Sequence, residues 1–317
     1  MDEISGVLKS EYGIVSNDVA ATAGGFSAKA YRAKDTRGTD YFVKVYDKSL
    51  PTTRFHAARI DSCMPVLDWL AKTPGLSGRV LTPVATRSGA YKAETERNLY
   101  VLFLFVHGSL PKVQGMTRAQ TAELAEILAL LHENGDNIPF ETYGIDEDTS
   151  LDFCGSLVRF LDGPNGKNGV LYGLVAPHSD MLRLAIRQAL HLRDTIRLGY
   201  SPLVLCHGDA HGNNVIQGER LVLADWEDLR CAPAEADLFI YAWHGYGDTL
   251  LKAYASARGG YGIDFELLHF YVLRRRIEDV WVDIQRLTEE SPGETETAKL
   301  LECIARGIAE VRAAYCR

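Results

Sequence analysis

The sequence predicts an α+β protein in which a small antiparallel β-sheet is followed by a larger, mainly helical region. Between residues 19 and 46, short runs of β-branched and aromatic residues alternate with glycine-containing or polar turns, a pattern typical of a β-meander. From residue 117 onward, apolar residues recur three and four positions apart, as on one face of a helix. We therefore expect an N-terminal lobe over residues 1–105, a connection at about 104–108 and a C-terminal lobe over residues 109–317.

Composition limits the classes of function. The net charge of −8 argues against a nucleic-acid partner, which needs a basic surface, and mildly favours a cationic ligand. The 6 cysteines lack a C-x-x-C spacing, which predicts free thiols in a reducing compartment. The chain opens without a signal-peptide pattern, and no apolar stretch is long enough to span a bilayer. We expect a cytoplasmic monomer or homodimer that contacts no membrane.

The first lobe is predicted from two helices and several strands. Ile4, Leu8 and Tyr12 are four residues apart, which predicts a helix over residues 1–12 that packs on a sheet. A second helix is expected over residues 55–72. Strand-like runs occupy residues 28–33, 41–46, 80–86 and 91–94, and the apolar run 99–106 predicts a central strand.

Lys44 lies inside the predicted strand 41–46, among β-branched and aromatic residues. A half-buried ammonium group is costly unless an anion lies beside it. Two interpretations are open: either Lys44 reaches solvent from an edge strand, or it meets a phosphate.

The second half of the chain is predicted to be helical. Thr117 and Gln120 form a capping-box pattern, so a helix should run to about residue 133. Further helices are expected over residues 151–161 and 179–199. The last 80 residues should form helices that are separated at Gly259-Gly260 and at residues 291–293.

The stretch 203–227 interrupts the helices with β-type segments. Leu203 to Cys206 form a short apolar run, a polar loop follows, and residues 215–224 are predicted to form a hairpin around a turn at 217–220. The hairpin should place Asn214 beside Asp225.

Two kinds of chemistry fit this stretch. His207-x-Asp209-x-His211 could be part of a metal-hydrolase site, since histidine and aspartate bind zinc-like ions. Alternatively, Asp209, Asn214 and Asp225 supply a phosphoryl-transfer site, because a carboxylate can accept the proton of an attacking hydroxyl while Mg²⁺ takes oxygen donors.

The order H-G-D-x-x-x-x-N, a hairpin and D-W-E resembles the aminoglycoside phosphotransferase and choline kinase families, distant relatives of protein kinases. The resemblance implies a bilobal, protein-kinase-like fold with a catalytic loop at residues 207–214. It implies that Asp209 is the catalytic base and that Asn214 and Asp225 carry Mg²⁺. His207 would support the loop, Asp237 would brace it, and His211 has no assigned role.

For the nucleotide, the resemblance implies that Lys44 holds the α- and β-phosphates of ATP or GTP and that the hinge backbone from Leu104 to Val106 receives the base. Gly24 and Gly25 would form the phosphate loop, although such a pair is more often a simple turn. Relatives pair the lysine with a helix glutamate. No Glu lies between Lys44 and Ala93, so Asp61 is expected in its place.

Two segments resemble spectinomycin phosphotransferases in particular: D-W-E-D-x-x-x-A-P-x-E-x-D-L-F at 225–239 and F-Y-x-x-R-R-R-I-E-D at 270–279. Protein-kinase activity is disfavoured, because glycine precedes Asp209 where protein kinases place arginine. The spacing from Asp225 to Asp237 also leaves no room for an activation loop.

Acidic and aromatic residues suggest a cationic acceptor. Carboxylates and aromatic faces stabilise ammonium groups, and the candidates are Asp228, Trp243, Glu278 and Asp279. For Glu278 and Asp279 an exposed helix face paired with Arg274 to Arg276 remains equally open, and a tryptophan is more often core.

These observations predict an ATP- and Mg²⁺-dependent kinase that phosphorylates a hydroxyl of an aminocyclitol or aminoglycoside antibiotic of the spectinomycin type. One alternative is a metabolic kinase for choline, ethanolamine, homoserine or a thio-sugar. A nucleotide-binding regulator without turnover is an alternative of another class.

Overall fold

The computed structural model describes residues 2–22, 28–111, 115–163, 169–196, 202–241, 246–290 and 292–316. Contacts divide the chain into two compact units, and each is formed by two separate segments. The first contains residues 1–146 and 203–261, and the second contains residues 147–202 and 262–317. The predicted lobe boundary at residues 105–109 does not coincide with this division and stays a prediction.

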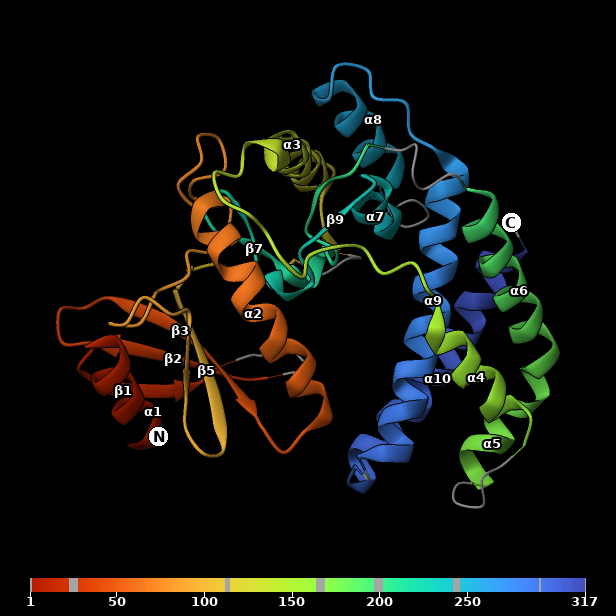
Figure 1. Cartoon of the computed structure of the whole chain (residues 1–317), viewed down its shortest axis with the longest axis horizontal. Helices are drawn as coiled ribbons and strands as arrows, with labels where there is room; N and C mark the ends of the chain where they lie inside the picture. The colour runs from red at the N-terminus through yellow and green to blue at the C-terminus, as the bar shows by residue number, and fades with distance from the viewer. Residues whose placement is uncertain are drawn as a thin grey trace. The chain divides into compact units, whose positions relative to one another are not determined.

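A five-stranded antiparallel sheet forms the N-terminal part of the first unit, in the order β1-β2-β3-β5-β4 (Figure 1). The strands are β1 (Ser16–Ala21), β2 (Lys29–Asp35), β3 (Asp40–Asp47), β4 (Lys92–Glu94) and β5 (Asn98–Leu104). The predicted strand at 80–86 is wrong: Val80 and Pro83 form only isolated bridges, to Leu223 and Phe103. A proline has no N–H to donate, so it does not suit the interior of a strand ladder.

Alternation along β3 determines which side chains reach each face of the sheet. Tyr41, Val43 and Val45 belong to the core that includes the N-terminal helical segment, α1 (Asp2–Val7) and η1 (Leu8–Tyr12). Because successive side chains point to opposite faces, Lys44 and Tyr46 lie on the other face. The predicted helix over residues 1–12 and its packing on the sheet are confirmed.

Lys44 is not on an edge strand, because β3 pairs with β2 on one side and β5 on the other. The interpretation in which Lys44 reaches solvent from a sheet edge is therefore wrong. Its side chain is only 10% exposed, so its charge must be balanced within the protein.

The rest of the first unit carries helices and short strand pairs. In Figure 1 the helix α2 (Pro51–Leu70) runs alongside the sheet. The strand β6 (Val204–Cys206) pairs with β9 (Arg230–Ala232), and β7 (Val215–Gln217) pairs with β8 (Leu221–Leu223), which confirms the predicted hairpin. The other helices are α3 (Arg118–Asn134), η3 (Gly135–Asn137), η6 (Gly212–Asn214), η7 (Trp226–Asp228), α7 (Glu235–Leu238), η8 (Phe239–Tyr241) and α8 (Gly247–Ala257).

The second unit contains only helices within its described residues. These helices are α4 (Asp152–Leu161), α5 (Gly169–Val175), η4 (Ala176–His178), α6 (Ser179–Thr195), α9 (Phe265–Glu289) and α10 (Glu294–Tyr315). The helices α9 and α10 pack on each other and on α6. The predicted breaks at Gly259-Gly260 and near Pro292 are confirmed. Among the described helices, none has the length and apolar character needed to cross a membrane.

Helix α3 begins with the capping box that the sequence predicts. Thr117 Oγ1 accepts a hydrogen bond from Gln120 N at 3.3 Å, and Gln120 Oε1 accepts one from Thr117 N at 2.7 Å. We expect Thr117→Ala to lower the free energy of unfolding by about 1 kcal/mol in urea titrations, whereas Thr117→Ser, which keeps the hydroxyl, should stay within about 0.5 kcal/mol. Equal losses in both variants would show that the cap contributes nothing.

Candidate active site

The predicted catalytic loop, residues 207–214, follows β6 directly, and one buried carboxylate, Asp237, binds its backbone. Asp237 Oδ2 accepts a hydrogen bond from His207 N at 2.8 Å, and Oδ1 accepts one from Gly208 N at 2.7 Å. Two backbone amides that would otherwise be buried without partners are thus satisfied. The structure therefore places Asp237 where the resemblance implies a brace for the loop.

His132 of α3 hydrogen-bonds to the Asp237 carboxylate. Its Nε2 lies 3.0 Å from Asp237 Oδ2, and its Nδ1 lies 2.7 Å from the Tyr254 hydroxyl. Burial would raise the pKa of Asp237, but the bond and charge of His132 and the loop amides hold it below its ordinary value. A role for His132 was not predicted from the sequence, although a histidine among the apolar residues of a helix was a possible signal.

His207 is fully buried, and both of its ring nitrogens contact backbone groups. Its Nε2 lies 2.9 Å from Ala224 O, and its Nδ1 accepts a bond from Asp209 N at 3.2 Å. The ring packs edge-on against Trp226, with centroids 4.5 Å apart. Burial lowers the pKa of His207, which favours the neutral ring. Both ring nitrogens are used, so the metal-hydrolase interpretation is wrong: His207 cannot also bind a metal.

A second group could hold a soft metal by distance alone, namely His132, Cys206 and Asp237. All three are buried, and each already has protein partners. Cys206 Sγ lies 3.4 Å from Pro233 O and 3.6 Å from Ala232 O, while His132 and Asp237 bond to each other. This group is a hydrogen-bonded support of the loop.

Gly208 allows the loop to approach the D-W-E segment closely. Its φ is +83°, and a Cβ at this position would lie 2.3 Å from Asp228 O and 2.7 Å from Arg230 Nε. A side chain would therefore suffer both backbone strain and a clash. This explains in physical terms why glycine stands before Asp209, where protein kinases place an arginine.

Asp209 is positioned by Asn214. The amide nitrogen Nδ2 of Asn214 donates to both Asp209 O and Asp209 Oδ2 at 2.9 Å. His211, which had no assigned role, caps η6 by accepting a bond from Asn213 N, and its Nε2 lies 3.4 Å from Asp209 Oδ2. Asn214 and His211 therefore both lie beside the same oxygen of the Asp209 carboxylate.

The β7–β8 hairpin brings Asn214 and Asp225 together, as the sequence predicts. Val215 pairs with Leu223, and Ala224 N donates to Asn214 O at 2.8 Å. Asp225 has a φ of +67°, which is rare for residues other than glycine and is often found at functional sites.

Lys44 lies between two carboxylates of the D-W-E segment. Its Nζ is 2.5 Å from Asp225 Oδ1 and 2.6 Å from Glu227 Oε1. Burial would lower the pKa of Lys44, but these two charges raise it well above its ordinary value. The same interactions lower the pKa of Asp225 against its own burial. Burial raises the pKa of Glu227 despite the nearby Lys44.

The expected pairing of Asp61 with Lys44 is wrong. Asp61 Oδ2 lies 2.6 Å from Lys92 Nζ, and the Asp61 side chain is 61% exposed. The neighbouring Ile60 is fully buried, so the helical period turns Asp61 away from the core. The contact of Glu227 with Lys44 was not predicted from the sequence. Neither was the role of Arg59, which donates to the carbonyl groups of Glu227 and Leu229.

A hard cation fits the oxygen donors beside Lys44. Asp225 is 36% exposed, and the amide of Asn214 directs its nitrogen to Asp209, which leaves its oxygen for another partner. Glu227 Oε2 is buried without a hydrogen-bond partner among the described residues. An all-oxygen donor set suits Mg²⁺, so the residues present fit that ion.

The hinge residues differ in their backbone contacts. Leu104 N donates to Thr82 O at 2.9 Å, and Phe105 N donates to Asp40 O at 3.0 Å. In the described part of the chain, no residue bonds to the backbone of Val106. Binding of a base by the backbone of Leu104 and Val106 stays a prediction.

For the remaining predicted site residues, the roles stay predictions. Gly24, Gly25 and Trp243 lie outside the described residues. Glu278 and Asp279 belong to the second unit, where Asp279 pairs with Arg275 at 2.8 Å and with Arg276 at 3.7 Å. This is the ion-paired helix face that was left open, so an acceptor role for Asp279 stays a prediction.

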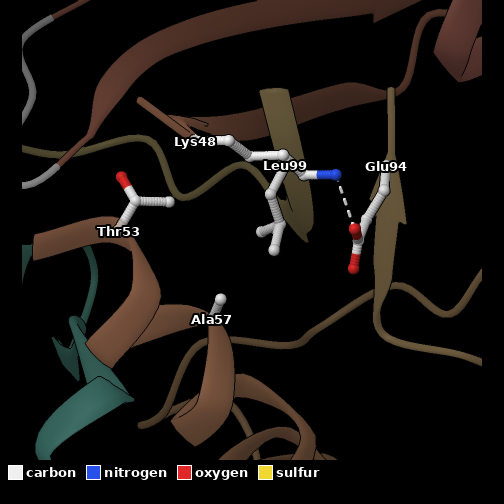
Figure 2. A pocket seen from close by; sticks show the side chains of 5 residues that line it. All are labelled: Lys48, Thr53, Ala57, Glu94 and Leu99. Carbon is white, nitrogen blue, oxygen red and sulfur yellow. Dashed lines mark ion pairs between the residues drawn. The ribbon is translucent and has the colours of Figure 1, made fainter. Parts of the chain in front are cut away.

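A cavity of about 260 Å³ lies between α2 and the sheet. Figure 2 shows its lining residues: Lys48, Thr53, Ala57, Glu94 and Leu99. Lys48 and Glu94 form an ion pair at 2.6 Å. No predicted site residue lines the cavity, so we assign it no part in the site.

Substitution of Gly208 tests the close approach of the loop to the D-W-E segment. Gly38 is a matched control, because its φ is +92° but a Cβ there would meet nothing within 4 Å. Gly38→Ala should cost about 1–2 kcal/mol through backbone strain alone. We expect Gly208→Ala to cost about 1–3 kcal/mol more through overpacking, as measured by urea unfolding. Equal losses in the two variants would contradict the close approach.

Solved structures of known proteins resemble this chain over most of its length. The chain is similar to the spectinomycin phosphotransferase APH(9)-Ia solved with ADP and spectinomycin, at 18% identity and a TM-score of 0.73 over 99% of this chain and 98% of that one. It is also similar to a choline kinase from Streptococcus pneumoniae, at 14% identity and a TM-score of 0.64 over 97% and 98% of the two chains.

An amicoumacin kinase solved with AMP-PNP and Ca²⁺ shows 13% identity and a TM-score of 0.66 over 98% of this chain and 93% of that one. At these identities the likeness shows a bilobal, kinase-like α+β fold. None of the curated protein sequences compared with the chain matches it. The sequence model of the phosphotransferase enzyme family matches residues 18–271, and the chain therefore belongs to this family of small-molecule kinases.

Proposed function

We propose that this enzyme transfers the terminal phosphate of ATP to a hydroxyl of a cationic, aminocyclitol-like antibiotic of the spectinomycin type. The observation that carries the proposal is the arrangement around the β7–β8 hairpin. Asp209 lies on one side with Asn214, and Asp225 lies on the other with Lys44. Phosphoryl transfer needs a proton acceptor, a cation site and a positive charge for the phosphates in one place, and this arrangement supplies all three.

Asp209 is proposed as the base that accepts the proton of the attacking hydroxyl. Asn214 holds one carboxylate oxygen at 2.9 Å, which fixes the direction of the group before the acceptor arrives. Asn214 and Asp225 would hold Mg²⁺, which neutralises charge on the phosphates when it is bound. Lys44 would bind the α- and β-phosphates, and the hinge backbone would bind the base.

The choice of acceptor is supported by charge and by likeness to relatives. The net charge of −8 favours a cationic molecule. Asp228 lies close to Gly208 through its backbone carbonyl; its side chain is 33% exposed and pairs with Arg230 at 3.6 Å. The spectinomycin phosphotransferase covers nearly the whole chain in the structural comparison.

The base assignment is tested by Asp209→Asn. Removal of the proton acceptor should lower kcat by about 10²- to 10⁴-fold, with nucleotide affinity changed by less than about threefold. Asp248→Asn, at an exposed position of α8, is the control and should keep wild-type turnover. Wild-type kcat in Asp209→Asn would exclude Asp209 as the base.

The acceptor is tested by measuring ADP release with a panel of hydroxylated amines. We expect turnover with spectinomycin or another aminoglycoside, and little with choline, ethanolamine, homoserine or a thio-sugar. The reverse preference would identify a metabolic kinase. Nucleotide binding without ADP release from any acceptor would identify a regulator.

A further inference from the structure

A lysine that binds phosphates must be held in place before the nucleotide arrives. In this chain both carboxylates that hold Lys44 come from one short segment, Asp225 and Glu227. Of the two, Asp225 is also a proposed cation ligand. Glu227 is the more deeply buried, with a side chain only 6% exposed, compared with 36% for Asp225.

Helix α2 supplies no carboxylate to Lys44. Its sequence contains two acidic residues, Asp61 and Asp68. Asp61 pairs with Lys92 and Asp68 with Lys72, at 2.6 Å and 2.5 Å. Both acids are therefore engaged away from Lys44.

Helix α2 instead binds the backbone around Glu227. Arg59 Nε donates to Glu227 O, and Arg59 Nη2 donates to Leu229 O, both at 2.6 Å. The helix thus fixes the main chain of the residue that carries the carboxylate. On the side-chain end, the Tyr46 hydroxyl donates to Glu227 Oε1. Tyr46 is two residues after Lys44 on β3, so both side chains leave the same face of the strand.

We propose that Glu227 is the positioning residue for the phosphate-binding Lys44, and that Arg59 and Tyr46 hold Glu227 for this task. The carboxylate thus comes from the D-W-E segment, and helix α2 contributes a guanidinium group that fixes the segment. A carboxylate held at the main chain and at the side chain gives Lys44 one fixed place, since both bonds to Lys44 join charged groups. This inference rests on the proposed kinase function.

The experiment is a double-mutant cycle on Lys44 and Glu227, measured as kcat/KM for ATP. Glu227→Gln keeps the shape but removes the charge, so we expect a loss of about 10- to 100-fold. The KM for the acceptor should stay within about twofold. In a Lys44→Met background, Glu227→Gln should cost less than about twofold more, because the group through which it acts is gone. Independent, multiplicative losses would overturn the proposal.

Two further variants keep the test decisive if Glu227→Gln unfolds. Tyr46→Phe removes the hydroxyl that bonds to Glu227, and Arg59→Met removes the two hydrogen bonds to the main chain. Each should lower kcat/KM for ATP by about 3- to 10-fold without moving the KM for the acceptor. Unchanged kcat/KM in both folded variants would overturn the proposal.

Asp61→Asn tests whether Asp61 or Glu227 is the partner of Lys44. We expect wild-type kcat/KM for ATP in this variant and in Asp68→Asn, the control on the same helix. A loss confined to Asp61→Asn would show that α2 supplies the carboxylate after all. If the wild-type enzyme releases no ADP with any acceptor, the proposed function fails. If the wild type turns over and Glu227→Gln matches it, only this inference fails.

Discussion

The buried carboxylate of Asp237 is the interaction on which the active site depends. It binds two consecutive amides of the predicted catalytic loop, and His132 binds it in turn. A buried charge is tolerated only when its hydrogen bonds are complete. These bonds link α3, α7 and the loop after β6, which are far apart in the sequence. The direction in which Asp209 points follows from this support.

A second buried charge organises the other half of the site. Lys44 lies on a central strand and is almost fully covered, so it needs anions close by. The hairpin after the catalytic loop supplies them, because β7 and β8 carry the chain back to Asp225. The sheet and the loop region are thus joined by electrostatic attraction as well as by apolar packing.

Local patterns in the sequence predicted much of this site. The spacing of Asp209, Asn214 and Asp225 and the hairpin between them follow from short-range rules, and the structure has the same arrangement. Lys44 could be recognised as unusual because a charged residue stood among β-branched and aromatic ones. Its partner could not be predicted in the same way, because it lies far away in the sequence.

The predictions that were wrong or missing have a common physical cause in tertiary packing. Asp61 was expected beside Lys44 because it is an acid on the appropriate helix, but the rotation of that helix turns it to solvent. Arg59 acts on backbone carbonyls, which every residue has. No residue pattern marks such an acceptor, so the contact could not be read from the sequence. The role of His132 also depends on a partner more than 100 positions away.

The bonds of Arg59 also bear on how helix α2 can move. Helix α2 cannot move away from the D-W-E segment without breaking two charge-assisted hydrogen bonds to its main chain. The helix and the segment therefore behave as one body, and their alignment is established when the protein folds.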